Sequence, residues 1–159
     1  MRIPKAVPIV LRRREGRTEV LVFAHPQAGT QIVKGTIEPG ESVAQACLRE
    51  LAEESGVTGT ECVRDLGTWE HCPRGQVWHF REVSVSGELP ETWSHFTQDG
   101  GGQVFTFRWH GLDQPAPADC HQAFVGALHF LQARLTELAR HAYALDDALP
   151  QSPVGECAE

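Results

Sequence analysis

The sequence predicts an α/β protein, and two observations support this prediction. Runs of β-branched and aromatic residues bounded by turn residues occupy much of the chain, and two segments with helical periodicity lie among and after them. The chain has 159 residues, of which 41% are hydrophobic and 22% are charged. Because this length fits one domain and no internal repeat or linker is visible, we expect a single domain over residues 1–149.

The first element is expected to be a β-hairpin. Two β-rich runs, residues 6–11 and 18–24, are joined by RRREGR, which places Gly16 in the turn. Four arginines lie in this connection and are candidates for phosphate contacts: Arg12, Arg13, Arg14 and Arg17. We interpret them as the solvated tip of a hairpin, and a phosphate site remains the alternative.

A helix is predicted to begin just after Ser42. Val43, Cys47, Leu48 and Leu51 are spaced to form one apolar stripe. Ser42 is a suitable N-cap, and Gly56 lies where a glycine commonly follows the last helical residue.

Three further β-rich runs follow this helix, at residues 62–69, 76–87 and 103–112, and turn residues separate them. A second helix is then predicted, because apolar residues recur at spacings of 4, 3, 4 and 3, namely at Phe124, Leu128, Leu131, Leu135 and Leu138. The last segment, residues 150–159, is expected to be a disordered tail.

Charge and cysteine content exclude several classes of protein. The formal net charge of -7 argues against duplex nucleic acid as a partner, because proteins that bind it usually carry a basic face. The five cysteines are scattered and match neither a zinc-site spacing nor a disulfide framework. No run is long enough for a signal peptide or a membrane span. We therefore expect a cytoplasmic protein that does not bind membranes.

Three carboxylates crowd one side of the first predicted helix. Glu50, Glu53 and Glu54 fall within an arc of about 100°, where like charges destabilise a helix. A hard divalent cation would neutralise them, and ligands that are all oxygen suit Mg²⁺ or Mn²⁺. The alternative is an ordinary solvated helix face, for which the glutamates by themselves would be unremarkable.

The residues around these glutamates identify a longer pattern. From Gly35 it reads as a glycine, five residues, Glu41, seven residues, Arg49-Glu50-Leu51, one residue, Glu53-Glu54, one residue and Gly56-Val57. This segment resembles the Nudix box, GX5EX7REUXEEXGU, where U is aliphatic, at all nine specified positions. The motif covers about a seventh of the chain.

The resemblance to the Nudix family implies an α/β/α sandwich with a mixed central sheet. It also implies Mg²⁺-dependent hydrolysis, with Mn²⁺ possible, of a nucleoside diphosphate linked to another moiety X. By position, Glu50, Glu53 and Glu54 match the metal-binding glutamates, and Glu53 or Glu54 also matches the group that activates or holds the attacking water.

Further roles carry over from the same motif. Glu41 matches a supporting loop glutamate, and Arg49 matches the arginine that orients a box glutamate. Gly35 matches the glycine whose backbone approaches the metal. Gly56 matches the glycine that ends the helix.

Outside the motif the sequence is less specific. Lys34 is a candidate phosphate contact. Many relatives carry a further glutamate before the last strand, but Gln103 stands near that place here, and Asp99 is the nearest acid. Asp99 is thus a second candidate for the substrate site.

The expected substrate is a small nucleotide derivative, and a homodimer is possible because dimers are frequent in the family. Two alternatives remain. An RNA 5′-end pyrophosphohydrolase would use the same motif, although the negative charge counts against it. A nucleotide-binding module without turnover would have no need of the intact glutamates.

Overall fold

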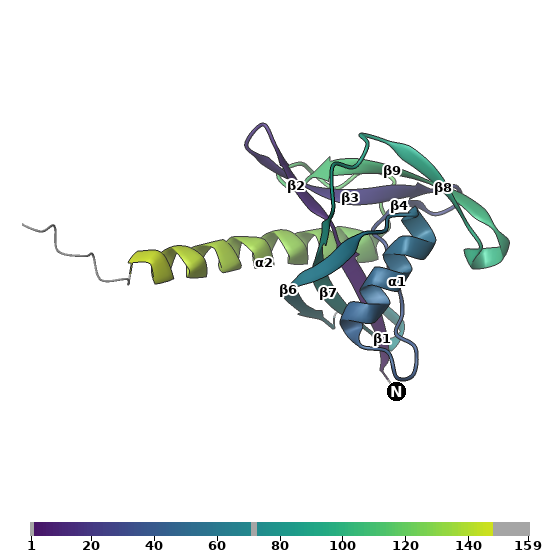
Figure 1. Ribbon diagram of the computed structural model, residues 1–159, viewed down its shortest axis with the longest axis horizontal. Coiled ribbons are helices and arrows are strands. Elements are labelled where there is room, and N and C mark those ends of the chain that lie inside the picture. The colour runs from purple at the N-terminus through teal and green to yellow at the C-terminus, as the bar shows by residue number, and fades with distance from the viewer. Residues whose placement is uncertain (1, 71–72, 148–159) are drawn as a thin grey trace, which may run out of the picture.

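The computed structural model describes residues 2–70 and 73–147, which form two β-sheets and two α-helices (Figure 1). The helices are α1 (Val43–Ser55) and α2 (Gln122–Asp147). The strands are β1 (Ile3–Ile9), β2 (Leu11–Arg14), β3 (Arg17–His25), β4 (Gly29–Gln31), β5 (Gly35–Thr36), β6 (Thr60–Trp69), β7 (Gln76–Val85), β8 (Trp93–Thr97) and β9 (Gln103–Gly111). Short 3₁₀ turns occur at Pro73–Gly75 and Asp99–Gly101.

The strands form two curled sheets. One has the order β5-β1-β7-β6 and is mixed, because β1 and β7 run parallel while the other pairs are antiparallel. The other has the order β2-β3-β9-β8, with β4 also paired to β3, and is antiparallel throughout. The predicted mixed α/β fold is therefore confirmed. The strands form two sheets, whereas a single mixed central sheet was expected.

The predicted N-terminal hairpin needs correction. β3 pairs with β2, which is much shorter than the expected partner run, and the two-residue turn at Glu15 and Gly16 has positive φ at both positions, as a type I′ turn requires. β1 instead pairs in parallel with β7 in the other sheet. The chain changes sheets at Val10, whose carbonyl accepts the Leu21 N–H at 3.0 Å.

The two helices cover opposite faces of β3. Val20 and Val22 lie in one core cluster, which also holds Phe124, Leu128 and Leu131 of α2. Leu21 and Phe23 lie in a second cluster, with Cys47 and Leu51 of α1. Because successive side chains of a strand point to opposite faces, the alternation places one helix on each side.

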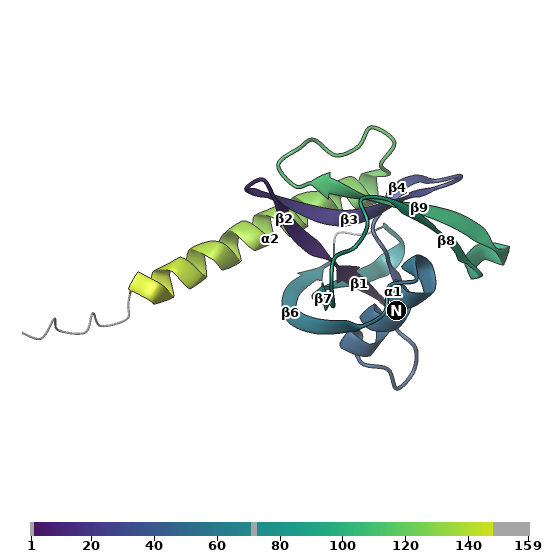
Figure 2. The same cartoon turned by 45° about the horizontal axis from the view of Figure 1, so that its top comes forward.

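The structure agrees with the predicted helix starting after Ser42 and departs from the sequence prediction in two other elements. β8 lies at an edge of its sheet and was not predicted. α2 continues nine residues past Leu138, and its last part stands clear of the sheets in both views (Figures 1 and 2). The tail predicted at residues 150–159 lies outside the described residues.

Within the described ranges, neither helix combines the length and the apolar character that crossing a bilayer requires.

Candidate active site

The position of α1 is fixed at both ends by local hydrogen bonds. Ser42 and Gln45 form a capping box: the Gln45 N–H donates to Ser42 Oγ at 3.0 Å, and the Ser42 N–H donates to Gln45 Oε1 at 2.9 Å. Gly56 ends the helix in the left-handed region at φ 75°, and its N–H donates to the Ala52 carbonyl. Trp93 of β8 adds a tertiary bond by donating its indole N–H to the Ser55 carbonyl at 2.9 Å.

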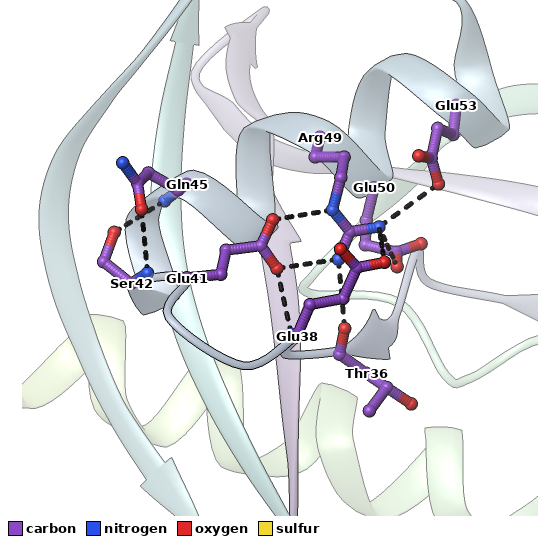
Figure 3. A network of polar contacts seen from close by, with 8 residues as sticks. All are labelled: Thr36, Glu38, Glu41, Ser42, Gln45, Arg49, Glu50 and Glu53. Atoms are coloured by element: carbon purple, nitrogen blue, oxygen red, sulfur yellow. Dashed lines mark hydrogen bonds and ion pairs between the residues drawn. The ribbon is translucent and has the colours of Figure 1, made fainter.

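Arg49 is the centre of a polar network on this helix (Figure 3). Its Nε and Nη2 donate to the two carboxylate oxygens of Glu41 at 2.7 and 2.8 Å. Its Nη1 donates to Glu50 Oε1 at 2.8 Å and to Glu53 Oε2 at 3.3 Å, and its Nη2 also reaches the Thr36 carbonyl at 3.0 Å. One guanidinium thus joins the loop after β5 to two of the glutamates of α1.

Glu41 belongs to this network as an anion. Its hydrogen bonds from Arg49 lower the pKa of the carboxyl to about 2, and the N–H of Glu38 contributes a further bond at 3.1 Å. The same contacts raise the pKa of Arg49. The bidentate geometry holds the guanidinium in one orientation, which is the arrangement that arginine favours with carboxylates.

Gly35 makes room for the Glu50 carboxylate. A Cβ atom at Gly35 would overlap the Glu50 carboxyl carbon and oxygens, so no larger residue fits without displacing that group. The carboxylate of Glu50, which is 7% exposed, therefore rests against the backbone of β5 while Arg49 holds it from the other side. The family resemblance implies that the Gly35 backbone approaches the metal, and the structure shows Gly35 against the carboxylate of Glu50.

The structure brings Asp99 to the glutamates of α1. One carboxylate oxygen from each of Glu50, Glu53 and Asp99 can be chosen so that all three lie within 4.8 Å of one another. Asp99 comes from the 3₁₀ turn between β8 and β9, where Gly100, Gly101 and Gly102 all have positive φ. From the sequence, Asp99 was identified only as the nearest acid, because distance along the chain does not show that this turn lies beside α1.

Glu54 is the most deeply placed member of the group. It is 7% exposed, and its Oε2 atom is buried and has no hydrogen-bond partner among the described residues. Burial raises the pKa of Glu54 to about 9, repulsion by Glu50 and Asp99 adds to the rise, and Lys34 opposes it. Burial also raises the pKa of Glu50, against the effect of Arg49.

These residues fit a divalent metal ion. Buried carboxylates that repel one another and a buried carboxylate oxygen with no donor are both features that a cation would satisfy. The available ligands are carboxylate oxygens, which suit Mg²⁺ or Mn²⁺ better than softer metals. Glu50, Glu53, Glu54 and Asp99 are the residues that would hold it.

Lys34 supplies positive charge next to this group. Its Nζ lies 3.4 Å from Gln76 Oε1 and 4.6 Å from the centre of the Trp78 ring, and its charge favours the ionised form of Glu54. A cation at this place is suited to contact a phosphate of a substrate that also contacts a metal.

The structure shows features of two further residues near the acidic group, Gln103 and Phe96, that the sequence did not predict. Gln103 stays outside the acidic group, and its Oε1 is buried without a hydrogen-bond partner in the described part of the chain. Phe96 is 61% exposed and lines, with Glu53 and Asp99, a hollow of about 340 Å³. An exposed phenylalanine cannot be told from a buried one without the register of β8.

Three of the hairpin arginines, Arg12, Arg13 and Arg14, line a different hollow of about 760 Å³, together with residues of β7, of β9 and of the loop after β7. Arg12 pairs with Glu19 and Glu91, Arg14 also pairs with Glu91, and Arg17 pairs with Asp113 at 3.5 Å. The interpretation as a solvated hairpin tip fits Arg13, Arg14 and Arg17, which are exposed, but not Arg12, which is half-buried against the Trp109 ring.

The family model described as the NUDIX domain matches residues 2–131. No curated protein sequence matches significantly.

Two solved structures share the fold. An Ap4A hydrolase from C. elegans, in a binary complex, has a TM-score of 0.58 at 17% identity, over 85% of this chain and 98% of its own. An ADP-ribose pyrophosphatase from Streptococcus suis has a TM-score of 0.58 at 14% identity, over 88% of this chain and 93% of its own. At these sequence identities the similarity shows that the fold is shared.

Proposed function

Because this chain belongs to the NUDIX domain family, whose members hydrolyse phosphoric anhydrides, we propose that it cleaves a small nucleoside diphosphate linked to a second moiety X. The observation that carries the proposal is the acidic group on α1, held in place by Arg49 and joined by Asp99 from a separate turn. The proposed metal is Mg²⁺, with Mn²⁺ as a substitute.

Each residue of the site has a distinct part in this proposal. Glu50, Glu53, Glu54 and Asp99 would hold the divalent metal, which when bound shields the phosphate charge and lowers the pKa of water. Arg49 fixes the orientation of Glu50 and Glu53, and Glu41 fixes Arg49 in turn, so the carboxylates are arranged before the substrate arrives.

The proton of the attacking water needs an acceptor. Glu53 and Glu54 are the candidates, and they differ in environment. Glu53 is exposed, with about half of its side chain accessible, whereas Glu54 is buried. Of two carboxylates, the more buried one is the stronger proton acceptor, because fewer water molecules stabilise its charge. We therefore assign to Glu54 the role of accepting the proton of the attacking water. Glu53, which is more exposed, would serve as a metal ligand.

Charges at the site and the names of the related structures support this substrate class. Lys34 lies near Glu54 and would contact a phosphate, while the negative net charge disfavours a long nucleic acid. The solved relatives are named for Ap4A and for ADP-ribose, which are both nucleotides joined through phosphates to a second group. The identity of X is left to experiment.

A panel of nucleotides tests this proposal directly. Dinucleoside polyphosphates, ADP-ribose and other nucleoside diphosphate sugars, and nucleoside triphosphates would each be incubated with the full chain and Mg²⁺. We expect a nucleoside monophosphate or another phosphorylated product from at least one class, and no product in the presence of chelator. Triphosphorylated RNA belongs in the same panel. Pyrophosphate release from RNA, with no small nucleotide cleaved, would replace the proposal with an RNA 5′-end activity, and binding without turnover would indicate a nucleotide-binding module.

Substitution of the two candidate acceptors tests the site. Glu54→Gln should lower kcat by at least about 10²-fold, because it removes the proposed base and a metal ligand together. Glu53→Gln should lower kcat by a similar factor through the metal. Glu61→Gln, on the exposed part of β6, is the matched control and should behave as the wild type. Unchanged kcat in both site variants would contradict the assignment.

A further inference from the structure

The side-chain ammonium of Lys34 is surrounded by neutral groups from two other elements. Its Nζ donates to Gln76 Oε1 at 3.4 Å and lies 4.6 Å from the centre of the Trp78 ring and 5.6 Å from the centre of the Phe124 ring. Both ring distances are within the range of about 6 Å over which an aromatic face attracts a cation. Gln76 and Trp78 belong to β7, and Phe124 belongs to the first turn of α2. These three side chains together form the Lys34 cage.

Contacts among the members of the Lys34 cage fix its shape. The Trp78 indole N–H donates to Gln76 Oε1 at 2.9 Å, so one amide oxygen accepts from both Trp78 and Lys34. The rings of Trp78 and Phe124 pack with their centres 5.3 Å apart. Both rings are buried in the core, where close packing holds a side chain in one orientation.

A second tryptophan supports the cage. Trp69 of β6 packs edge-on against Trp78, with the ring centres 5.3 Å apart and an interplanar angle of 80°. Gly126 of α2 leaves the space for this ring, because a Cβ atom there would lie 2.8 Å from two of the Trp69 ring atoms. The beginning of α2 is thus packed against β6 and β7 in a way that places Phe124 beside Lys34.

The caged ammonium lies next to the acidic group. Lys34 immediately precedes Gly35 of β5, and its charge acts on Glu54. An amide oxygen and two aromatic rings attract an ammonium without carrying a charge of their own, so they do not cancel its charge as a carboxylate would. The charge stays available to an anion that approaches the acidic group together with a metal.

We propose that Gln76, Trp78 and Phe124 position Lys34 to contact a diphosphate at the edge of the acidic group. This inference rests on the proposed function, which supplies the diphosphate. Trp78 is 1% exposed and Phe124 is 6% exposed, so both act through Lys34 and are positioning residues. The first turn of α2 is therefore part of the phosphate site, although it lies far from Lys34 in the sequence.

The affinity of the full chain for imidodiphosphate, a diphosphate that resists hydrolysis, tests this proposal by calorimetry in the presence of Mg²⁺. Gln76→Glu keeps the size of the side chain and an acceptor for the Trp78 N–H, but it pairs Lys34 with a carboxylate. We expect the dissociation constant to rise by about tenfold or more, because the new ion pair competes with the phosphate.

Gln45→Glu is the matched control for the added charge. It places the same charge on α1 and keeps the capping box, since glutamate forms this box as glutamine does. Its dissociation constant should stay within about twofold of the wild type. A wild type that does not bind imidodiphosphate overturns the proposal, and so does Gln76→Glu with the affinity of Gln45→Glu.

Phe124→Leu tests the aromatic part of the cage. It keeps an apolar side chain but removes the ring face, and the dissociation constant should rise by about threefold to tenfold. Phe130→Leu is the matched control, because Phe130 is on the same helix and packs on Phe80 with the ring centres 5.0 Å apart. It should bind imidodiphosphate as the wild type does.

A double-mutant cycle with Lys34→Met separates positioning from a structural role. In the Lys34→Met background, Phe124→Leu should cause no further loss of affinity. An equal loss in both backgrounds overturns the proposal, because Phe124 would then act on binding without Lys34. The readout is affinity without turnover, so a failure here and a failure of the proposed hydrolase activity in the nucleotide panel are separate results.

Discussion

At the scale of single residues, the arrangement of the acidic group depends on two residues that are not acidic themselves, Arg49 and Gly35. Arg49 holds Glu50 and Glu53 through one nitrogen, and its other two nitrogens are taken by Glu41 and the Thr36 carbonyl. Gly35 leaves the space in which the Glu50 carboxylate rests. In the proposed function both residues would act by placing a carboxylate.

Gly35→Ala tests the steric part of this account. The added Cβ would overlap the Glu50 carboxylate and push it from its place, so we expect kcat to fall by about 10- to 10²-fold. Binding of Mn²⁺, measured by calorimetry, should weaken in parallel. Gly111→Ala is the control, because its nearest neighbour is a side-chain oxygen of the exposed Asp113 at 3.0 Å. Normal metal binding by Gly35→Ala would show that Glu50 is not a ligand.

The Glu41–Arg49 pair predicts a dependence of stability on pH. Because the folded protein holds the pKa of Glu41 at about 2, below the ordinary value of 4.5, the folded state binds a proton there less readily than the unfolded state does. Its contribution is therefore present above about pH 4.5 and is lost as the pH falls toward 2.

Melting temperatures between pH 7 and pH 2 check this sign. Glu41→Gln should be less stable than the wild type at pH 7, and the difference should shrink as the pH falls through this window. Glu88→Gln, in the β7–β8 connection, is the control and should follow the wild-type curve. A constant difference between Glu41→Gln and the wild type at all pH values would contradict the account.

At the scale of elements, α1 carries most of the acidic group, and its start is determined locally. Ser42 and Gln45 exchange hydrogen bonds across the first turn, and the sequence S-x-x-Q at this place is itself a signal of a helix start. The position of Asp99 is a different matter. It depends on the edge strand β8 and on the glycine-rich 3₁₀ turn that follows it, neither of which the sequence pattern predicts.

Ser42→Ala tests the cap. Losing the side-chain acceptor should lower the free energy of unfolding by about 1 kcal/mol, measured by denaturant titration. Combined with Gln45→Ala in a double-mutant cycle, the two changes should be less than additive, because they remove the same reciprocal contact. Thr58→Ala, exposed and just beyond the helix, is the control. Full additivity would show that the capping box does not act as a unit.

At the scale of the whole molecule, the acidic group joins both sheets through α1. β5, which carries Gly35, belongs to the mixed sheet, while Asp99 follows β8 of the antiparallel sheet. A metal held by Asp99 and by Glu50, which rests against Gly35 of β5, would therefore link the two sheets. Binding to the folded state alone stabilises it in proportion to the logarithm of the ligand concentration.

Thermal unfolding with and without Mg²⁺ measures this link. At a concentration of about 100 times the dissociation constant, Mg²⁺ should raise the free energy of unfolding by about 2.7 kcal/mol, which corresponds to several degrees in Tm. The rise should be absent in Glu50→Gln, and KCl at the same ionic strength should not reproduce it. An equal rise in wild type and variant would show that Mg²⁺ acts elsewhere.

The sequence by itself determined the family, the chemistry and most of the elements. The spacing from Gly35 to Val57 named the residues around the acidic group, and the caps of α1 were predictable because they depend on residues within a turn of each other. The α/β class also followed from local periodicity, since each helix and most strands have a recognisable pattern.

Only the tertiary structure decided what depends on distant contacts. It showed that residues 3–9 pair with β7 and not with β3, because parallel pairing leaves no turn signal in the sequence. It brought Asp99, and not Gln103, to the glutamates of α1. It also showed that the stripe of α2 leaves the body after Leu138, since periodicity gives the face of a helix but not the point at which its partner ends.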